Sequence, residues 1–124
     1  MSLPGAWALG AIAVVTLSAF PGAAADKAAA APGQAVYDKE CAHCHGATGK
    51  GDGEESAYLT PSPQDFTTGT LDKRSDDFLA AVIVKGGKAQ GLSDAMPPTP
   101  KLSQENVKDL VAYIRKLGKG EKGK

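Results

Sequence analysis

The sequence has no excess of either charge, because its 124 residues include 14 Lys and Arg and 14 Asp and Glu. Nucleic-acid-binding proteins usually carry a clear basic excess, so this balance argues against that class. No stretch alternates apolar and polar residues with a period of two, and no pair of nucleophile and base is visible. Gly49, Gly51 and Gly53 superficially match a nucleotide-binding loop, but no predicted strand precedes them. The length supports a single domain.

Charged side chains are missing from residues 3–25. An apolar stretch at 6–20 is broken by Pro21-Gly22, and small residues follow up to Ala25, as at a signal-peptidase site. Residues 1–25 are therefore predicted to be a signal peptide cut after Ala25. Residues 1–5 contain no Lys or Arg, so the alternative is an uncleaved membrane anchor, since 23 uncharged residues can span a bilayer. Either interpretation predicts that the rest of the chain is exported.

Large apolar residues are scarce in the 99 residues that follow Ala25. They include only 16 Leu, Ile, Val or Phe, with three Tyr and one Met. A domain of this size with so little apolar material rarely builds a self-sufficient core, and small domains of this kind usually depend on a disulfide, a metal or a bulky cofactor.

Three helices are predicted, over residues 33–43, 75–85 and 103–117. The second and third open with Ser75 and Ser103 as N-caps, carry acidic residues in their first turns, and end at glycine. The fold class is therefore all-α, with long Gly- and Pro-rich loops that in a compact domain usually wrap something. Residues 26–32 are predicted to be a flexible lead-in and 118–124 a disordered basic tail.

The segment Cys41-Ala42-His43-Cys44-His45 has the C-x-x-C-H spacing typical of covalent haem attachment. The two thiols can form thioethers with the two vinyl groups of one porphyrin, and His45 is then placed under the iron as an axial ligand. A redox disulfide of the thioredoxin type would need a βαβ context. A zinc site would need further ligands, and the sequence has no other cysteine and no histidine beyond His43 and His45.

Met96 is the predicted second axial ligand. It is the only methionine after Ala25 and is followed by Pro97 and Pro98, which stiffen the approach of a loop residue to a fixed point. A lone methionine is more often core filler, but a loop between two helices is a poor place for filler. His43 lies two residues from His45 and is not expected to reach the opposite face of a haem.

With these residues in view, the chain from 33 to 117 resembles the class I c-type cytochromes. The resemblance implies a cytochrome c fold wrapped around one covalently attached haem c. It also implies a close crossing of the first and last helices, and a proline carbonyl that accepts the Nδ1–H of His45. Pro61 is the candidate for that carbonyl and Pro63 the alternative. The crossing is expected to use Gly33, Tyr37, Leu110 and Tyr113.

Two protein ligands would fill both axial positions of the iron, which predicts a non-enzymatic one-electron carrier between periplasmic or membrane redox partners. The alternative is a haem subunit of a larger dehydrogenase or oxidase. An enzyme or gas sensor would require Met96 to leave the iron. Docking to redox partners is expected to be transient. Four lysines could form a basic docking rim, or they could simply be scattered solvated residues: Lys50, Lys85, Lys88 and Lys101.

Overall fold

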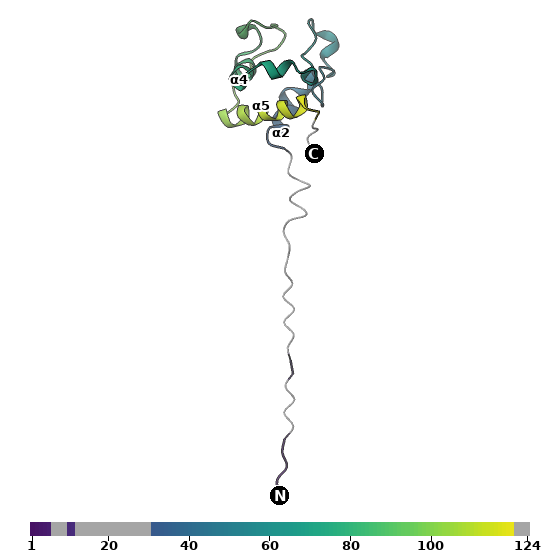
Figure 1. The fold of residues 1–124 in the computed structure, drawn as a ribbon, viewed down its shortest axis with the longest axis vertical. Helices are drawn as coiled ribbons and strands as arrows, with labels where there is room; N and C mark the ends of the chain where they lie inside the picture. The colour runs from purple at the N-terminus through teal and green to yellow at the C-terminus, as the bar shows by residue number, and fades with distance from the viewer. Residues whose placement is uncertain (6–9, 12–30, 121–124) are drawn as a thin grey trace.

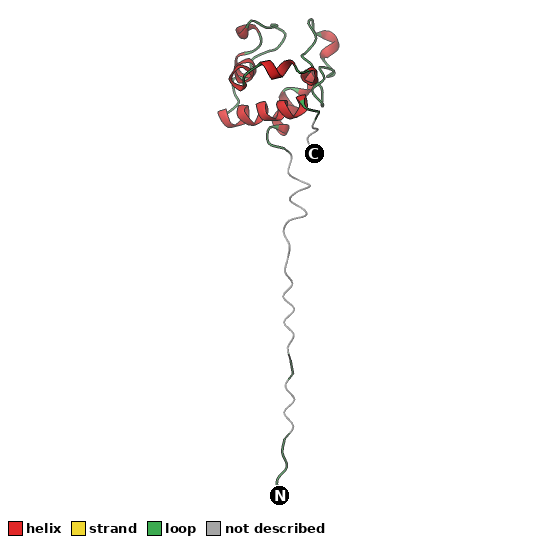
Figure 2. Ribbon diagram, in the orientation of Figure 1, coloured by secondary structure: helices red, strands yellow, loops and turns green. Residues whose placement is uncertain are grey.

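The computed structural model describes residues 1–5, 10–11 and 31–120. Within these ranges every regular element is a helix and none is a strand, which confirms the predicted all-α fold (Figure 2). None of the helices described there is long and apolar enough to cross a membrane. Most of the predicted signal peptide and lead-in lies outside the described residues.

The first predicted helix is divided in two. Helix α2 covers Gln34–Glu40 and helix α3 covers Ala42–His45, with Cys41 between them at φ −123° and ψ −38°. The expected single helix over 33–43 was therefore wrong at both ends. Gly33 lies outside α2 as its N-cap at φ +84°, and the helical segment continues to His45. The break at Cys41 separates the part that packs against the last helix from the part that carries the haem motif.

The other two predicted helices are confirmed almost to the residue. Helix α4 covers Asp76–Lys85 and helix α5 covers Gln104–Gly118. The hydroxyls of Ser75 and Ser103 accept hydrogen bonds of 3.1 Å from the backbone N–H groups three residues later. Gly118, where the disordered tail was expected to begin, closes α5 instead, and the Lys119 N–H donates to the Arg115 carbonyl at 3.2 Å. Residues 121–124 lie outside the described chain.

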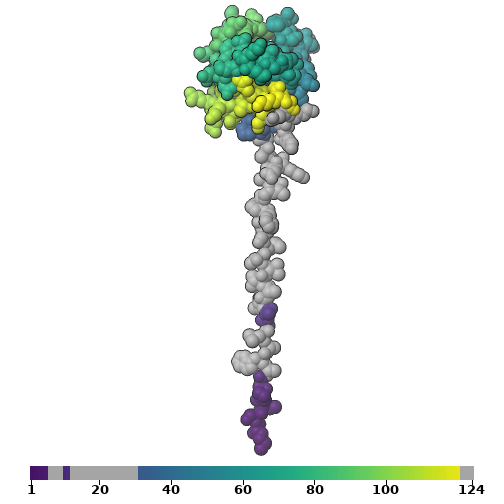
Figure 3. All heavy atoms as spheres, in the orientation of Figure 1, coloured from purple at the N-terminus to yellow at the C-terminus, as the bar shows by residue number. Residues whose placement is uncertain are grey.

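Four short 3₁₀ helices lie within the segments that were predicted to be irregular loops. They are η1 (Ser56–Tyr58), η2 (Phe66–Thr68), η3 (Thr70–Lys73) and η4 (Lys88–Gln90). In Figure 1, α5 runs along one edge of the domain, with α2 crossing it and α4 lying above it. Figure 3 shows the teal residues of α4 beside the yellow end of α5 on one face of the molecule, in agreement with their packing contacts.

The crossing of α2 and α5 is the tightest point of the fold. A Cβ atom on Gly33 would lie 2.3 Å from the Asp109 carbonyl oxygen, so only glycine fits there. One turn later the rings of Tyr37 and Tyr113 meet edge to face, with centroids 5.3 Å apart. Tyr37 and Leu110 are 0% exposed and Tyr113 is 2% exposed. The crossing that the resemblance implied is therefore confirmed.

Arg115 of α5 ties the segment before α4 to the rest of the domain. Its guanidinium donates to the carbonyls of Leu71 and Arg74 at 2.7 and 2.6 Å and to the Asp76 carboxylate at 2.8 Å. These contacts bridge about forty positions of sequence, and they fix the backbone of η3 against α5.

Candidate functional site

Helix α3 presents the Cys-x-x-Cys-His motif, and a glycine loop folds back along it. The N–H groups of Gly51, Gly53 and Glu55 donate to the carbonyls of His45, Cys44 and His43, at 2.8, 3.1 and 2.9 Å. A Cβ atom on Gly53 would lie 2.3 Å from the His43 carbonyl oxygen, so the loop must carry glycine to approach so closely. The loop that contains Gly49, Gly51 and Gly53 is thus hydrogen-bonded to the backbone of the Cys-x-x-Cys-His motif, as expected for a loop beside the predicted haem.

The His45 ring is held by two neighbours. It stacks on the Phe66 ring with centroids 4.6 Å apart, and its Nδ1 lies 3.1 Å from the Gln64 carbonyl oxygen. Because a carbonyl only accepts hydrogen bonds, Nδ1 is the protonated nitrogen and Nε2 keeps its lone pair. Burial lowers the pKa of His45, the Gln64 hydrogen bond opposes that shift, and the nearby His43 adds to it. The result favours the neutral imidazole that binds metals.

The carbonyl that orients His45 belongs to Gln64, not to Pro61 or Pro63. Pro61 is exposed. The Pro63 carbonyl faces the glycine loop instead, where a Cβ atom on Gly51 would lie 2.4 Å from its oxygen. The expectation for Pro61 and the alternative for Pro63 were therefore both wrong. The carbonyl lies three residues after Pro61 and one residue after Pro63. Every residue has a backbone carbonyl, so no side-chain signal in the sequence identifies Gln64.

The side chains of Cys41 and Cys44 are both half-buried. Burial, with smaller contributions from the charges of Glu40 and Cys44, raises the pKa of Cys41 to about 12. Burial and the neighbouring Glu55 raise the pKa of Cys44.

One small cluster of possible metal ligands stands beside the motif. The donor atoms of His43, Cys44 and Glu55 lie within 4.8 Å of one another, and this is the one such group in the described chain. The side chains are at most half-buried, and the Cys44 sulfur is already assigned to haem attachment. His43 does not line the cavity described next, in keeping with its predicted lack of an axial role.

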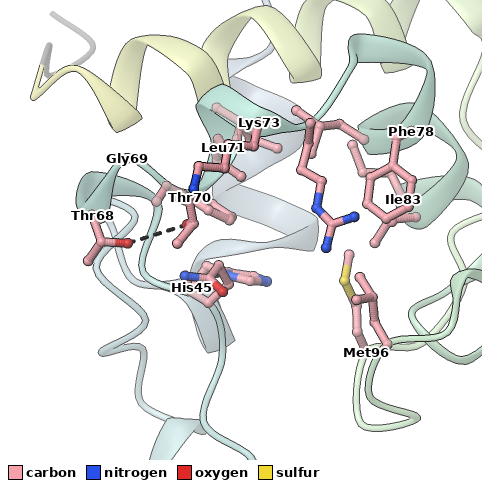
Figure 4. Close-up of a pocket in the computed structure, with 16 residues that line it drawn as sticks. His45, Thr68, Gly69, Thr70, Leu71, Lys73, Phe78, Ile83 and Met96 are labelled. Carbon is pink, nitrogen blue, oxygen red and sulfur yellow. Dashed lines mark hydrogen bonds between the residues drawn. The ribbon is translucent and has the colours of Figure 1, made fainter.

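A cavity of about 660 Å³ lies between His45 and the loop that carries Met96. Figure 4 shows His45 on one side and Met96 on the other, with Leu71 and Ile83 on the walls between them. The volume falls in the range typical of small-molecule and cofactor sites. Cys41 and Cys44 do not line it, but they lie four residues and one residue before His45 in the chain. The lining is mainly apolar and includes five polar or charged residues besides His45: Gln64, Thr68, Thr70, Lys73 and Arg74.

The Met96 loop is fixed to the end of α4. The Met96 carbonyl accepts a hydrogen bond of 3.0 Å from the Gly87 N–H, and the Thr99 N–H donates to the Ile83 carbonyl at 2.9 Å. The Met96 side chain is half-buried and packs against the core. On its outer side, Lys85 and Lys88 line a second hollow of about 500 Å³. Lys50 and Lys101 do not line that hollow, so only two of the four lysines gather there.

These residues fit a haem. A ring-shaped apolar cofactor requires an apolar cavity, an imidazole nitrogen with a free lone pair, and two cysteines adjacent to that imidazole. The structure supplies the apolar cavity and an imidazole whose Nε2 keeps its lone pair, and Cys41 and Cys44 lie four residues and one residue before that imidazole. The thioether sulfur of Met96 lies on the side of the cavity away from His45, and a thioether is a soft donor that can bind haem iron.

Comparison with known proteins agrees with this chemistry. The cytochrome c family model matches residues 30–118. Cytochrome c-554(547) of Halothiobacillus neapolitanus is 32% identical over 89 residues, which cover 71% of this chain and 96% of that protein. The cbb3-type cytochrome c oxidase subunit CcoP of Azospirillum brasilense is 31% identical over 97 residues, 77% of this chain but only 31% of the subunit. The chain thus spans about a third of CcoP. The match over the whole helical domain places this chain in the cytochrome c family, whose members bind haem c covalently and carry electrons on it.

Proposed function

We propose that this chain is a one-electron carrier whose haem is bound through Cys41 and Cys44 and ligated by His45 and Met96. The supporting observation is that His45 and Met96, far apart in sequence, line the same apolar cavity from opposite sides. The haem supplies the redox chemistry by gaining and losing one electron at its iron.

The residues around the cavity would set the potential at which that electron moves. The Gln64 carbonyl orients His45 and increases its basicity as a ligand, while the thioether of Met96 favours the reduced iron. The apolar walls exclude water, which also favours the less charged, reduced state. If His45 and Met96 both held the iron, no coordination site would remain for a substrate, so the chain is proposed to act without catalysis.

The partners are proposed to be redox proteins that dock transiently. Lys85 and Lys88 line the hollow beside Met96 together with one acidic residue, Asp94, and this excess of positive charge would suit an acidic partner. Residues 1–25 are proposed to be a signal peptide that directs the chain to the periplasm, where covalent haem attachment and docking would take place.

A second candidate is a haem c subunit of a larger oxidase. The similarity to CcoP, an oxidase subunit of which this chain spans about a third, supports that alternative. Retention of the N-terminal segment as an anchor, or a partner that stays bound through purification, would favour the subunit over the free carrier.

The Met96→Ala variant tests the proposed ligation. The variant should keep covalent haem, because Cys41 and Cys44 are untouched, but lose the weak far-red absorption band of Met–ferric ligation. Its reduction potential should fall, and added imidazole should bind to the opened position. Absorption spectra, redox titration and a denatured-state mass measure these effects. Pro100→Ala, an exposed position in the same loop, is the control and should retain the parental spectrum. A Met96→Ala protein with the original potential and no imidazole binding would refute the assignment.

A further inference from the structure

Gly86 and Gly87 follow α4 directly and are both buried. Gly86 has φ +82°, a conformation that favours glycine and ends the helix. Gly87 is different, because its φ of −63° and ψ of −44° are ordinary helical values that any residue adopts. Backbone freedom therefore does not explain a glycine at position 87, and the reason must lie in its surroundings.

The chain after η4 packs directly on the backbone of Gly87. A Cβ atom at this position would lie 2.2 Å from the Ser93 carbonyl oxygen and 3.4 Å from the Met96 Cβ. The Gly87 N–H donates to the Met96 carbonyl at 3.0 Å, and the Gly87 carbonyl accepts from the Leu92 N–H at 2.9 Å. Both backbone groups of Gly87 are thus bonded to the segment that carries Met96.

The Met96 loop has little freedom to absorb a displacement. Pro97 and Pro98 fix their own φ angles directly after Met96, and Pro98 packs against Gly86, whose Cβ position lies 3.0 Å from the Pro98 nitrogen. On the far side, the Thr99 N–H is bonded to the Ile83 carbonyl inside α4. A shift imposed at Gly87 would therefore move the loop as a unit, and Met96 with it.

We propose that Gly87 is a positioning residue for Met96. Its lack of a side chain lets the loop lie close enough to aim the Met96 sulfur into the cavity. This inference rests on the proposed role of Met96 as an axial ligand and names the contact that holds the ligand in place. A ligand displaced by about 1 Å binds markedly less well, so a single methyl group at position 87 should weaken a bond in which it takes no part.

The test is the Gly87→Ala holoprotein. The methyl group meets the Ser93 carbonyl, so the far-red band should lose at least half its intensity, and imidazole should bind roughly tenfold more tightly than to the parent. The potential should fall toward that of Met96→Ala. Spectroscopic imidazole titration and redox titration of the purified, haem-loaded protein provide these values.

Gly91→Ala is the matched control. It lies in the same turn at φ +72°, with nothing within 4 Å of its Cβ position. It should cost stability through its backbone conformation while leaving the far-red band and imidazole affinity of the parent. Comparing the two variants thus distinguishes the effect of a strained backbone from the effect of a displaced Met96 loop.

Two results from the variants would overturn the proposal. If Met96→Ala changes the band and potential but Gly87→Ala leaves both as in the parent, Gly87 does not position the ligand, although the ligation stands. If Met96→Ala itself changes neither, the proposed function fails first.

Amide hydrogen exchange in the parent protein gives a test that does not depend on the variant folding. Displacement of Met96 by imidazole should accelerate exchange of the Gly87 N–H, which is bonded to the Met96 carbonyl, and unchanged protection would contradict the coupling.

Discussion

At the scale of single residues, Arg115 shows how one side chain fixes a wall of the site. Its guanidinium binds two carbonyls and one carboxylate, and two of these partners, Leu71 and Arg74, belong to residues that line the cavity. The Arg74 side chain lies over the Phe78 ring at 4.5 Å from its centroid, so the wall is held from both sides. Arg115 therefore acts on the site through the backbone that it supports.

The Arg115→Ala substitution should lower the free energy of unfolding by about 2–3 kcal/mol, because two carbonyls and a carboxylate lose a charged donor. Arg115→Lys should recover only part of this loss, since an ammonium cannot reproduce the planar fork. Chemical denaturation of the haem-loaded protein measures both. Asp76→Asn is the control for the ion pair alone and should cost less than about 1 kcal/mol, because Asp76 is largely exposed. An equal loss from Asp76→Asn and Arg115→Ala would mean that the carbonyl contacts contribute nothing.

At the scale of helices, the crossing of α2 and α5 depends on a backbone contact that allows no side chain. Gly33 combines a left-handed conformation with a Cβ position 2.3 Å from the Asp109 carbonyl oxygen. The edge-to-face contact of Tyr37 with Tyr113 then fills the space beside it, and the Tyr37 hydroxyl donates to the Gly46 carbonyl at 2.7 Å. The same helix pair thereby anchors the start of the glycine loop beside α3.

The Gly33→Ala variant should unfold with a free energy about 2–4 kcal/mol lower than the parent. The substitution adds both the cost of a left-handed non-glycine residue and the cost of overpacking against α5. Thermal unfolding followed by circular dichroism measures the change. Gly91→Ala, left-handed but in open space, carries only the first cost and should lose about 1–2 kcal/mol. Equal losses in the two variants would show that the close approach of the helices costs nothing to disturb.

At the scale of the whole molecule, the hydrophobic core and the proposed cofactor site share many of their side chains. Of the twelve hydrophobic side chains that are buried in the described part of the chain, six also line the cavity: Phe66, Leu71, Leu79, Val82, Ile83 and Ile114. Half of the scarce buried apolar side chains therefore face the cavity that the haem is proposed to fill. Folding and haem attachment are expected to be coupled, as metal binding and folding are in small metal domains.

The Cys41→Ala/Cys44→Ala double variant should fail to accumulate as a stable, helical protein, because it cannot retain the group that completes this core. Helical content and resistance to proteolysis, compared with those of the haem-loaded parent, measure the effect. Ala35→Ser, at an exposed position of α2 away from the motif, serves as the control for expression and export. A double variant with the parental helical content and cooperative unfolding would show that the polypeptide core suffices without the cofactor.

Much of this protein is determined by local sequence. Helices α4 and α5 begin at the residues that follow their serine caps and stop at or near glycines, since capping depends only on neighbours in the chain. The Cys-x-x-Cys-His spacing is equally local and predicts the cofactor, and the glycine and aromatic positions of the helix crossing follow from the family resemblance. The cytochrome c domain match confirms what these signals predict about the family.

Only the tertiary structure decided which backbone groups serve the site. The carbonyl that orients His45 belongs to Gln64, and the Gly87 N–H holds the Met96 loop, yet neither group has a side-chain signature. The three contacts of Arg115 likewise depend on segments that are distant in sequence. Local signals determine which elements form and which chemistry they carry. The packing of distant segments decides which carbonyls and amides face that chemistry, because every residue offers the same backbone groups.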